Sequence, residues 1–266
     1  MTKQKVSSQI DKRGVATVTL NNPEKHNAFD DAIIAELTAA FEHIANNKAV
    51  RVMILAAKGK SFSAGADLGW MKRMANYSYE ENIKDAKALA AMLQTLNFLP
   101  LPTIARVQGG AFGGAVGLVS CCDMAVASPQ ASFSLSEVKI GIIPATISPY
   151  VIDAIGQRAA RRYFTTAELF DAQTAAQLGL VSKVVEEEQL DNEISKLVDT
   201  LLANSPAAIV AAKKLVFDVA GQKIDDQLIA FTCKQIADIR VSTEGQEGLA
   251  AFFEKRKPTW RVDEHV

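Results

Sequence analysis

Strand and helix patterns alternate through the first two thirds of this 266-residue chain, and only helix patterns follow. Two β-branched apolar runs, residues 14–20 and 51–57, are typical of buried strands. Between them, residues 30–47 carry apolar side chains at helical spacing. This order predicts a β-α-β unit with parallel strands.

The rest of the chain extends this pattern and then changes. A polar helix is expected over residues 80–98, and two prolines then precede a third strand at 103–107, with a fourth at 123–127. From residue 191 onward, the spacing predicts helix after helix. We therefore expect an α/β core over residues 1–200 and a helical region over residues 201–266, packed as one unit because no flexible linker separates them.

Charge and cysteine content exclude several classes of protein. The 29 Lys and Arg nearly balance the 30 Asp and Glu, so no excess positive charge favours nucleic acid or an anionic membrane. The uncharged stretch at residues 107–122 is shorter than the ~20 apolar residues that span a bilayer. Three cysteines without a spaced framework, and no secretory signal, favour a reduced cytoplasmic protein.

Common catalytic signatures are incomplete. Residues 58–61 read KGKS, but Ile54 stands where a phosphate-binding loop needs glycine. Ser63 and Ser120 lack the flanking glycines of a nucleophile elbow. No HExxH or CxxC pattern supplies a metal ligand set. These absences argue against phosphoryl transfer, serine hydrolysis and a dedicated metal site.

Two of the predicted strands end in loops of small residues, at 61–68 and 108–114. The carboxyl ends of parallel strands meet at one edge of a sheet, where unpaired backbone N–H groups face a ligand. Residues without bulky side chains let an oxygen approach such donors closely. The two loops therefore indicate a site for an oxyanion, although close helix–sheet packing alone would also favour small residues.

Glu137 lies in an otherwise apolar segment, SEVKIGIIP. Partial burial would raise the pKa of its carboxyl group toward a range useful for acid–base catalysis. The alternative is a solvated glutamate at a strand edge, paired with Lys139.

Five segments, in order, carry a family resemblance: SFSAGADL, VQGGAFGGAVGLVSCCDMAVAS, FSLSEVKIGIIP, AQLGLVSKVV and EGLAAFFEKRKPTW. Together they resemble the crotonase, or enoyl-CoA hydratase/isomerase, superfamily over nearly the whole chain. The resemblance implies a spiral of ββα units, a C-terminal helical region that forms homotrimers or hexamers (dimers of trimers), and an acyl-CoA thioester substrate. Coenzyme A would be part of the substrate, with no separate cofactor or metal.

The resemblance also implies roles for individual positions. The backbone N–H groups of Ala64 and Gly114 would form the oxyanion hole, and Glu137 would be the catalytic acid/base. The stretch Ala66, Asp67 and Leu68 would follow the coenzyme A moiety. In the C-terminal motif, Phe252 and Lys255 would reach the nucleotide bound by a neighbouring subunit.

One position departs from the family pattern, and it bears on the reaction. Hydratases of the family usually carry a second glutamate where this chain has Gly117. A finer resemblance, to hydratases of 3-methylglutaconyl-CoA and isohexenylglutaconyl-CoA in leucine and terpenoid breakdown, nevertheless favours hydration. Such a substrate has a distal carboxylate, for which Lys72, Arg73 and Lys139 are candidate partners.

The leading expectation is syn addition of water to a 2,3-enoyl-CoA, with a branched glutaconyl-CoA as substrate. An enoyl-CoA isomerase or decarboxylase that uses Glu137 alone is the alternative within the family. A non-catalytic oligomer that binds acyl-CoA or RNA is the alternative from another class. Trp70, Met71 and Met74 are expected to line the acyl pocket or to pack in the core.

Overall fold

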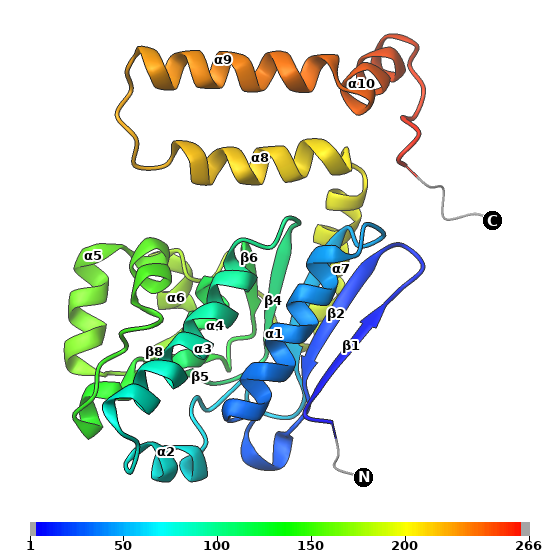
Figure 1. Ribbon diagram of the computed structural model, residues 1–266. Helices are drawn as coiled ribbons and strands as arrows, with labels where there is room; N and C mark the ends of the chain where they lie inside the picture. Colours follow the sequence, from blue (N-terminus) through cyan, green and yellow to red (C-terminus); the bar gives the residue numbers. More distant parts are fainter. Residues whose placement is uncertain (1–3, 262–266) are drawn as a thin grey trace.

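The computed structural model describes residues 4–261, and a six-stranded sheet forms its centre (Figure 1). The strand order is β1-β2-β3-β4-β6-β9, with β1 and β2 antiparallel and the other neighbours parallel. The strands are β1 (Val6–Ile10), β2 (Val15–Leu20), β3 (Val52–Ala57), β4 (Thr103–Val107), β6 (Met124–Ala127) and β9 (Lys183–Val184). The four predicted strands are confirmed as β2, β3, β4 and β6, whereas β1 and β9 were not predicted.

The sheet is covered on both faces because its strands alternate two sets of apolar side chains. Val15, Val52 and Ile104 pack on one face against α7 (Leu190–Leu202). The residues next to them in each strand, such as Ala16, join the larger cluster on the opposite face. This period of two is the geometric consequence of the pleat.

Helices α1 (Asp31–Asn46) and α3 (Tyr79–Asn97) pack against each other beside this larger cluster. In α1 the buried residues recur at helical spacing, and the Asp30 carboxylate caps the helix by accepting from the Ile33 N–H at 3.0 Å. The other helices of the core are α2 (Leu68–Met74), α4 (Gly114–Ser120), α5 (Ser148–Thr166) and α6 (Ala172–Leu178).

A second sheet of three short strands lies beside α4. It consists of β5 (Ala111–Phe112), β7 (Ser132–Ser134) and β8 (Phe170–Asp171), together with the 3-10 turn η2 (Ser136–Ile140) that follows β7. Strand β5 leads directly into α4, and β7 leads into η2. The sheet therefore brings the start of α4 close to the segment that carries Glu137.

The last three helices, α8 (Pro206–Val219), α9 (Asp226–Val241) and α10 (Thr243–Phe253), stand away from the rest of the molecule (Figure 1). We call residues 206–253 the arm and residues 4–202 the core. Neither α8 nor α9 contains a buried residue. The boundary expected at residue 200 falls inside α7, two residues before that helix ends.

No single helix within residues 4–261 has the length and apolar character of a membrane span. Two helical segments joined at a bend, 187–202 and 206–219, reach that length and apolar character only when they are taken together.

Candidate functional site

The two loops of small residues meet at one edge of the larger sheet, as predicted. Strands β3 and β4 are parallel neighbours, and the loops that follow them form a further parallel bridge between Ser63 and Ala111. In that bridge the Ser63 N–H donates to the Gly110 carbonyl at 3.1 Å, and the Phe112 N–H donates to the Ser63 carbonyl at 3.0 Å. The loop backbones are thus held side by side.

Two buried amide side chains hold the first loop in place. The Gln108 Nε2 donates to the carbonyls of Ala57, Gly59 and Ser61 at 2.9–3.2 Å. The Asn27 Nδ2 donates to the carbonyl of Ser61 at 3.0 Å and to that of Lys58 at 2.8 Å. Sequence reasoning missed both residues, because nothing in the sequence shows which carbonyls a polar side chain in a loop will contact.

The structure contradicts the expectation that the Ala64 N–H is a free donor, and the unpaired N–H of this loop is that of Ala66. The Ala64 N–H donates to the His26 carbonyl at 2.9 Å, and Ala64 does not line the cavity described below. A parallel bridge pairs Ala66 with Phe29 through the N–H groups of Phe29 and Asp67. This pairing leaves the Ala66 N–H without a hydrogen-bond partner within residues 4–261.

Gly114 has a second unpaired amide at the site. It is the first residue of α4, and its N–H likewise has no partner among the described residues, whereas the preceding N–H of Gly113 donates to the Ser134 carbonyl at 2.8 Å. A Cβ on Gly114 would lie 2.7 Å from Cζ of the buried Phe29. Glycine is therefore required where the backbone approaches Phe29 this closely.

Glu137 lies on η2 with its carboxylate near the start of α4. Its Oε1 is 3.1 Å from the place that a Cβ on Gly113 would occupy. Its Oε2 is buried and accepts no hydrogen bond from any residue that the structure describes. Burial raises the pKa of the Glu137 carboxyl. Lys139 is exposed and forms no ion pair with Glu137 among the described contacts, so the solvated alternative is wrong.

Ala66, Gly114 and Glu137 line one cavity of about 940 Å³. Its wall is mainly apolar and lies between α2, α3 and the segment that follows η2. The expected wall residues Trp70, Met71 and Met74 are among those that line it. The other lining side chains belong to Phe29, Ala75, Tyr79, Asn82, Ile83, Asp85, Ala86, Leu89, Ile140, Ile142, Ile143, Pro144, Ala145, Thr146 and Ile147.

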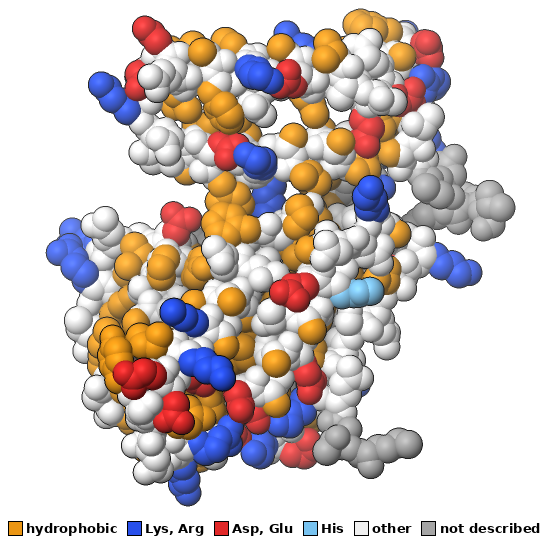
Figure 2. All heavy atoms as spheres, viewed as in Figure 1, with side chains coloured by type: hydrophobic (Ala, Val, Ile, Leu, Met, Phe, Trp, Pro, Cys, Tyr) orange, Lys and Arg blue, Asp and Glu red, His pale blue; other side chains and the backbone are white. Residues whose placement is uncertain are grey.

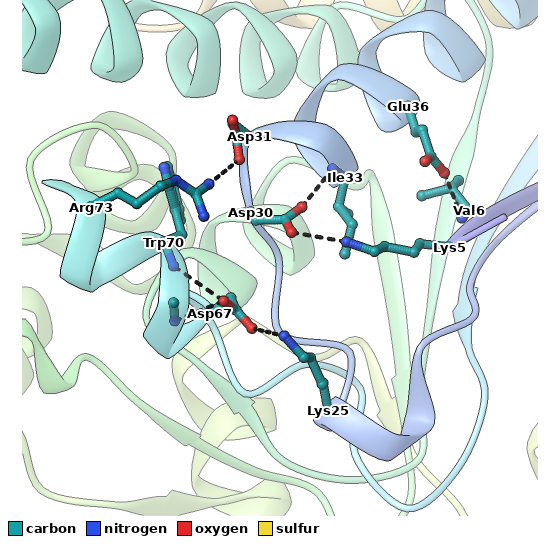
Figure 3. A network of polar contacts seen from close by, with 11 residues as sticks. Lys5, Val6, Lys25, Asp30, Asp31, Ile33, Glu36, Asp67, Trp70 and Arg73 are labelled. Carbon is teal, nitrogen blue, oxygen red and sulfur yellow. Dashed lines mark hydrogen bonds and ion pairs between the residues drawn. The ribbon is translucent and has the colours of Figure 1, made fainter. Parts of the chain in front are cut away.

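Asp67 has a structural role that the sequence analysis did not assign (Figure 3). Its Oδ1 caps α2 by accepting from the N–H groups of Gly69 and Trp70 at 2.8 and 3.1 Å. Its Oδ2 pairs with the Lys25 Nζ at 2.8 Å, and this hydrogen bond lowers the pKa of the Asp67 carboxyl. The next residue, Leu68, is 74% exposed. Contact of this stretch with coenzyme A stays a prediction.

Gly117 is packed tightly inside the core. A Cβ there would lie 2.4 Å from Cγ2 of Ile147 and 3.5 Å from Cδ2 of Leu93. The space that a side chain at position 117 would need is therefore occupied by Ile147, which also lines the cavity. Glu137 and Asp85 are the only carboxylates among the described residues of the cavity wall.

The other expected side chains lie outside the cavity wall. None of Lys72, Arg73 and Lys139 lines it, and the Arg73 Nη2 pairs with Asp31 Oδ1 at 2.5 Å (Figure 3). Phe252 lies in the last turn of α10 and Lys255 just after this helix, which is far from α2 in the same chain (Figure 1). Within residues 4–261, no group of three or more His, Cys, Asp or Glu side chains could hold a metal ion.

Known proteins share both the sequence and this architecture. The pattern of the family described as enoyl-CoA hydratase/isomerase matches residues 11–263. A short-chain-enoyl-CoA hydratase of Clostridium acetobutylicum is 32% identical over 93% of this chain and 95% of its own length. An enoyl-CoA hydratase crystal structure from Shewanella pealeana superimposes with a TM-score of 0.94 and 48% identity, covering 97% of this chain and 96% of that one.

A third relative, the enoyl-CoA hydratase structure from Mycobacterium smegmatis, is 34% identical, with a TM-score of 0.92 over 98% of this chain and all of that one. The sequence match and the shared fold agree over almost the full length of the described chain. The protein therefore belongs to the enoyl-CoA hydratase/isomerase family and has the crotonase fold.

Proposed function

We propose that this protein is a hydratase that adds water in syn fashion across the 2,3-double bond of an enoyl-CoA thioester. One observation carries the proposal: the unpaired amides of Ala66 and Gly114 and the carboxylate of Glu137, whose buried Oε2 has no partner among the described residues, line the same mainly apolar cavity. A reaction through an enolate needs these groups. Negative charge develops on the thioester oxygen, which the amides would hold, and a proton must pass from water to C2, which the carboxylate would carry.

The proton transfers balance with a single carboxylate. The ionised Glu137 takes a proton from water as the water oxygen forms a bond to C3, and the π electrons move onto the thioester oxygen. The N–H groups of Ala66 and Gly114 hold that enolate oxygen, each contributing roughly 3–4 kcal/mol by precedent. Glu137 then gives its proton to C2, the carbonyl reforms, and the carboxylate is restored. Every step uses the chain's own groups, so we propose no cofactor beyond the coenzyme A of the substrate.

The cavity bears on the nature of the acyl group. The glutaconyl-CoA expected from the sequence resemblance needs a cation for its distal carboxylate, and none of the described residues of the cavity wall is Lys or Arg. We therefore propose that the preferred substrate has an uncharged acyl tail. The assay below compares such a substrate with 3-methylglutaconyl-CoA.

Isomerisation is the second candidate, and the packing of Gly117 favours it. Because Ile147 occupies the space beside Gly117, no second carboxylate assists water there. An isomerase or decarboxylase would need only the proton shuttle of Glu137 and the two amides.

The arm supports a proposal about assembly. Large apolar side chains are exposed along α8 and α9, and Figure 2 shows hydrophobic atoms on the outer surface of these helices. We propose that they pack against other copies of the chain in a homotrimer or a hexamer. Phe252 and Lys255 would then contact coenzyme A bound by a neighbouring copy.

An absorbance assay tests the function. Loss of the conjugated enoyl-thioester band is followed with crotonyl-CoA and 3-methylglutaconyl-CoA, for the wild-type protein and for Glu137→Gln. We expect turnover of crotonyl-CoA that falls about 10²–10⁴-fold in the variant, because one group serves both proton transfers. Wild-type turnover in Glu137→Gln would refute the assignment of that residue.

A further inference from the structure

Asp85 is a charged residue in the cavity wall that the reaction above does not use. It lies on α3, and its Oδ1 accepts a hydrogen bond from the indole Nε1 of Trp70 at 3.1 Å. Trp70 is only 3% exposed, so the indole that holds this carboxylate is itself fixed by packing. An N–H donor aimed at a carboxylate stabilises its charged form.

The charges around Asp85 provide no cation inside the cavity. Burial raises the pKa of the Asp85 carboxyl, with Asp31 acting in the same direction and Arg73 in the opposite one. Arg73 pairs with Asp31 (Figure 3), and neither residue lines the cavity, so their charges offset each other beside the site. Among the described residues that line the cavity, the charged ones are therefore Asp85 and Glu137, both acidic.

We propose that Asp85 determines specificity by excluding acyl-CoA thioesters whose tail ends in a carboxylate, which leaves uncharged apolar tails as the accepted substrates. The inference rests on the proposed function in one respect: the cavity must receive the acyl group. A second anion in a mainly apolar wall would meet the partly buried Asp85 with no Lys or Arg among the described lining residues, and like charges repel more strongly in a partly desolvated site than in bulk water. An alkyl tail carries no charge that Asp85 would repel, and most of the side chains that line the cavity are apolar.

Two saturated thioesters isolate this effect from catalysis. Pentanoyl-CoA and glutaryl-CoA have acyl chains of equal length, differ in whether the tail ends in a methyl or a carboxylate, and cannot be hydrated. Calorimetric titration gives both dissociation constants for the wild type, Asp85→Asn and Glu80→Gln. Asparagine keeps an oxygen that accepts from the Trp70 indole. Glu80→Gln removes the same charge from an exposed position on the same helix, outside the cavity.

We expect the wild type and Glu80→Gln to bind pentanoyl-CoA at least ten-fold more tightly than glutaryl-CoA. In Asp85→Asn the ratio should fall to about three-fold or less, through tighter binding of glutaryl-CoA. Binding of pentanoyl-CoA shows that the variant is folded, and Asp85→Ser provides a second test if Asp85→Asn does not fold.

Equal binding of the two ligands by the wild type, or a ratio that Asp85 variants leave unchanged, would overturn the inference. Because the titration needs no turnover, a protein that hydrates no enoyl-CoA but still rejects glutaryl-CoA would refute the proposed function and uphold the role of Asp85.

Discussion

The core and the arm differ in where they place their apolar side chains. In the core, both faces of the larger sheet are covered, and the catalytic candidates lie where two loops approach within hydrogen-bonding distance. In the arm, Val216 is 65% exposed and Ile229 is 50% exposed. The core can thus hold its own geometry, whereas the arm has an apolar surface that this chain alone leaves uncovered.

Few contacts join the two regions. The Lys213 Nζ of α8 donates to Asp123 Oδ2 at 2.7 Å and to the Leu101 carbonyl at 3.0 Å, and the ring of Phe217 lies 4.9 Å from that of Phe98. Helices of this length are marginal in water without packing. The candidate catalytic site and the proposed assembly surface therefore lie in different regions. Substitutions in the core should change the kinetics, whereas substitutions in the arm should change the oligomeric state.

The largest effect should come from adding one methyl group in the core. Gly114→Ala places a Cβ against the buried Phe29 and displaces the amide that would hold the enolate. We expect kcat to fall about 10²–10³-fold, as when one oxyanion donor is lost. The same substitution in the arm, Gly248→Ala, meets only the edge of the Trp260 ring at 3.1 Å and should leave kcat unchanged. Equal losses of kcat in the two variants would contradict the placement of the catalytic site in the core alone.

Charge on the arm should act on assembly. Placing aspartate at both Val216 and Ile236 puts charge in the exposed apolar surface and should reduce the molar mass measured by light scattering to that of one chain. Lys223→Asp changes an exposed polar position of the same arm and should leave the mass at that of a trimer or hexamer. A wild-type protein that is already a single chain would contradict the role given to the arm.

Loosening the link between the regions should lower stability moderately. Lys213→Met removes the cation from Asp123, which also accepts from the N–H and hydroxyl of Thr103. We expect the free energy of unfolding in urea to fall by about 1–3 kcal/mol. The neighbouring Lys214 is 70% exposed, so Lys214→Met should change it by less than about 0.5 kcal/mol. Similar losses in both variants would mean that the Lys213 contact does not hold the arm.

A smaller effect would show that the arm contributes to a neighbouring site. Phe252 is 77% exposed, and we expect Phe252→Ala or Lys255→Ala to raise KM for the acyl-CoA about three- to ten-fold with kcat unchanged. Lys234→Ala, on α9, is the matched control. Unchanged KM in both variants, measured on assembled protein, would confine the site to one chain.

Lowering the pH should affect activity and stability in opposite directions at Glu137: activity should decrease, whereas the contribution of this residue to stability should increase. Burial raises the pKa of the Glu137 carboxyl. As the pH is lowered, kcat/KM should therefore begin to fall at a pH above the range in which an ordinary glutamate is protonated, because protonation removes the base. The folded pKa lies above the unfolded one, so the protonated form stabilises the fold, and this contribution is lost as pH rises through the folded pKa. At neutral pH, Glu137→Gln should therefore unfold at a temperature no lower than the wild type. A lower unfolding temperature would contradict the burial of an unpaired charge.

Much of the core could be predicted from the sequence because its signal is local. Short apolar runs, two of them rich in β-branched residues, identified β2, β3, β4 and β6, and their order implied that the two loops meet at one edge. Strand β1 escaped prediction because its sequence, VSSQI, is polar and it lies at the edge of the sheet. Strand β9 has only two residues, too few to show a period.

The site was harder to predict because hydrogen-bond pairing decides it. Ala64 and Ala66 are both small residues of one loop, and only the pairing with Phe29 shows which N–H stays unpaired. Asp85 stood in a helix that was interpreted simply as polar, and no spacing rule predicts its contact with Trp70. Glu137 stood out as a lone carboxylate in an apolar segment, and the structure places it in the cavity wall, whereas its catalytic role, which the family resemblance implied, stays a prediction.

The central claim is that the amides of Ala66 and Gly114 and the Glu137 carboxylate together add water to an enoyl thioester. Mass spectrometry of the product formed from crotonyl-CoA in ¹⁸O-labelled water tests it most directly. We predict a product that gains one water and carries the label at C3, formed about 10²–10⁴-fold more slowly by Glu137→Gln. A product of unchanged mass, or one formed equally fast by the variant, would contradict the account.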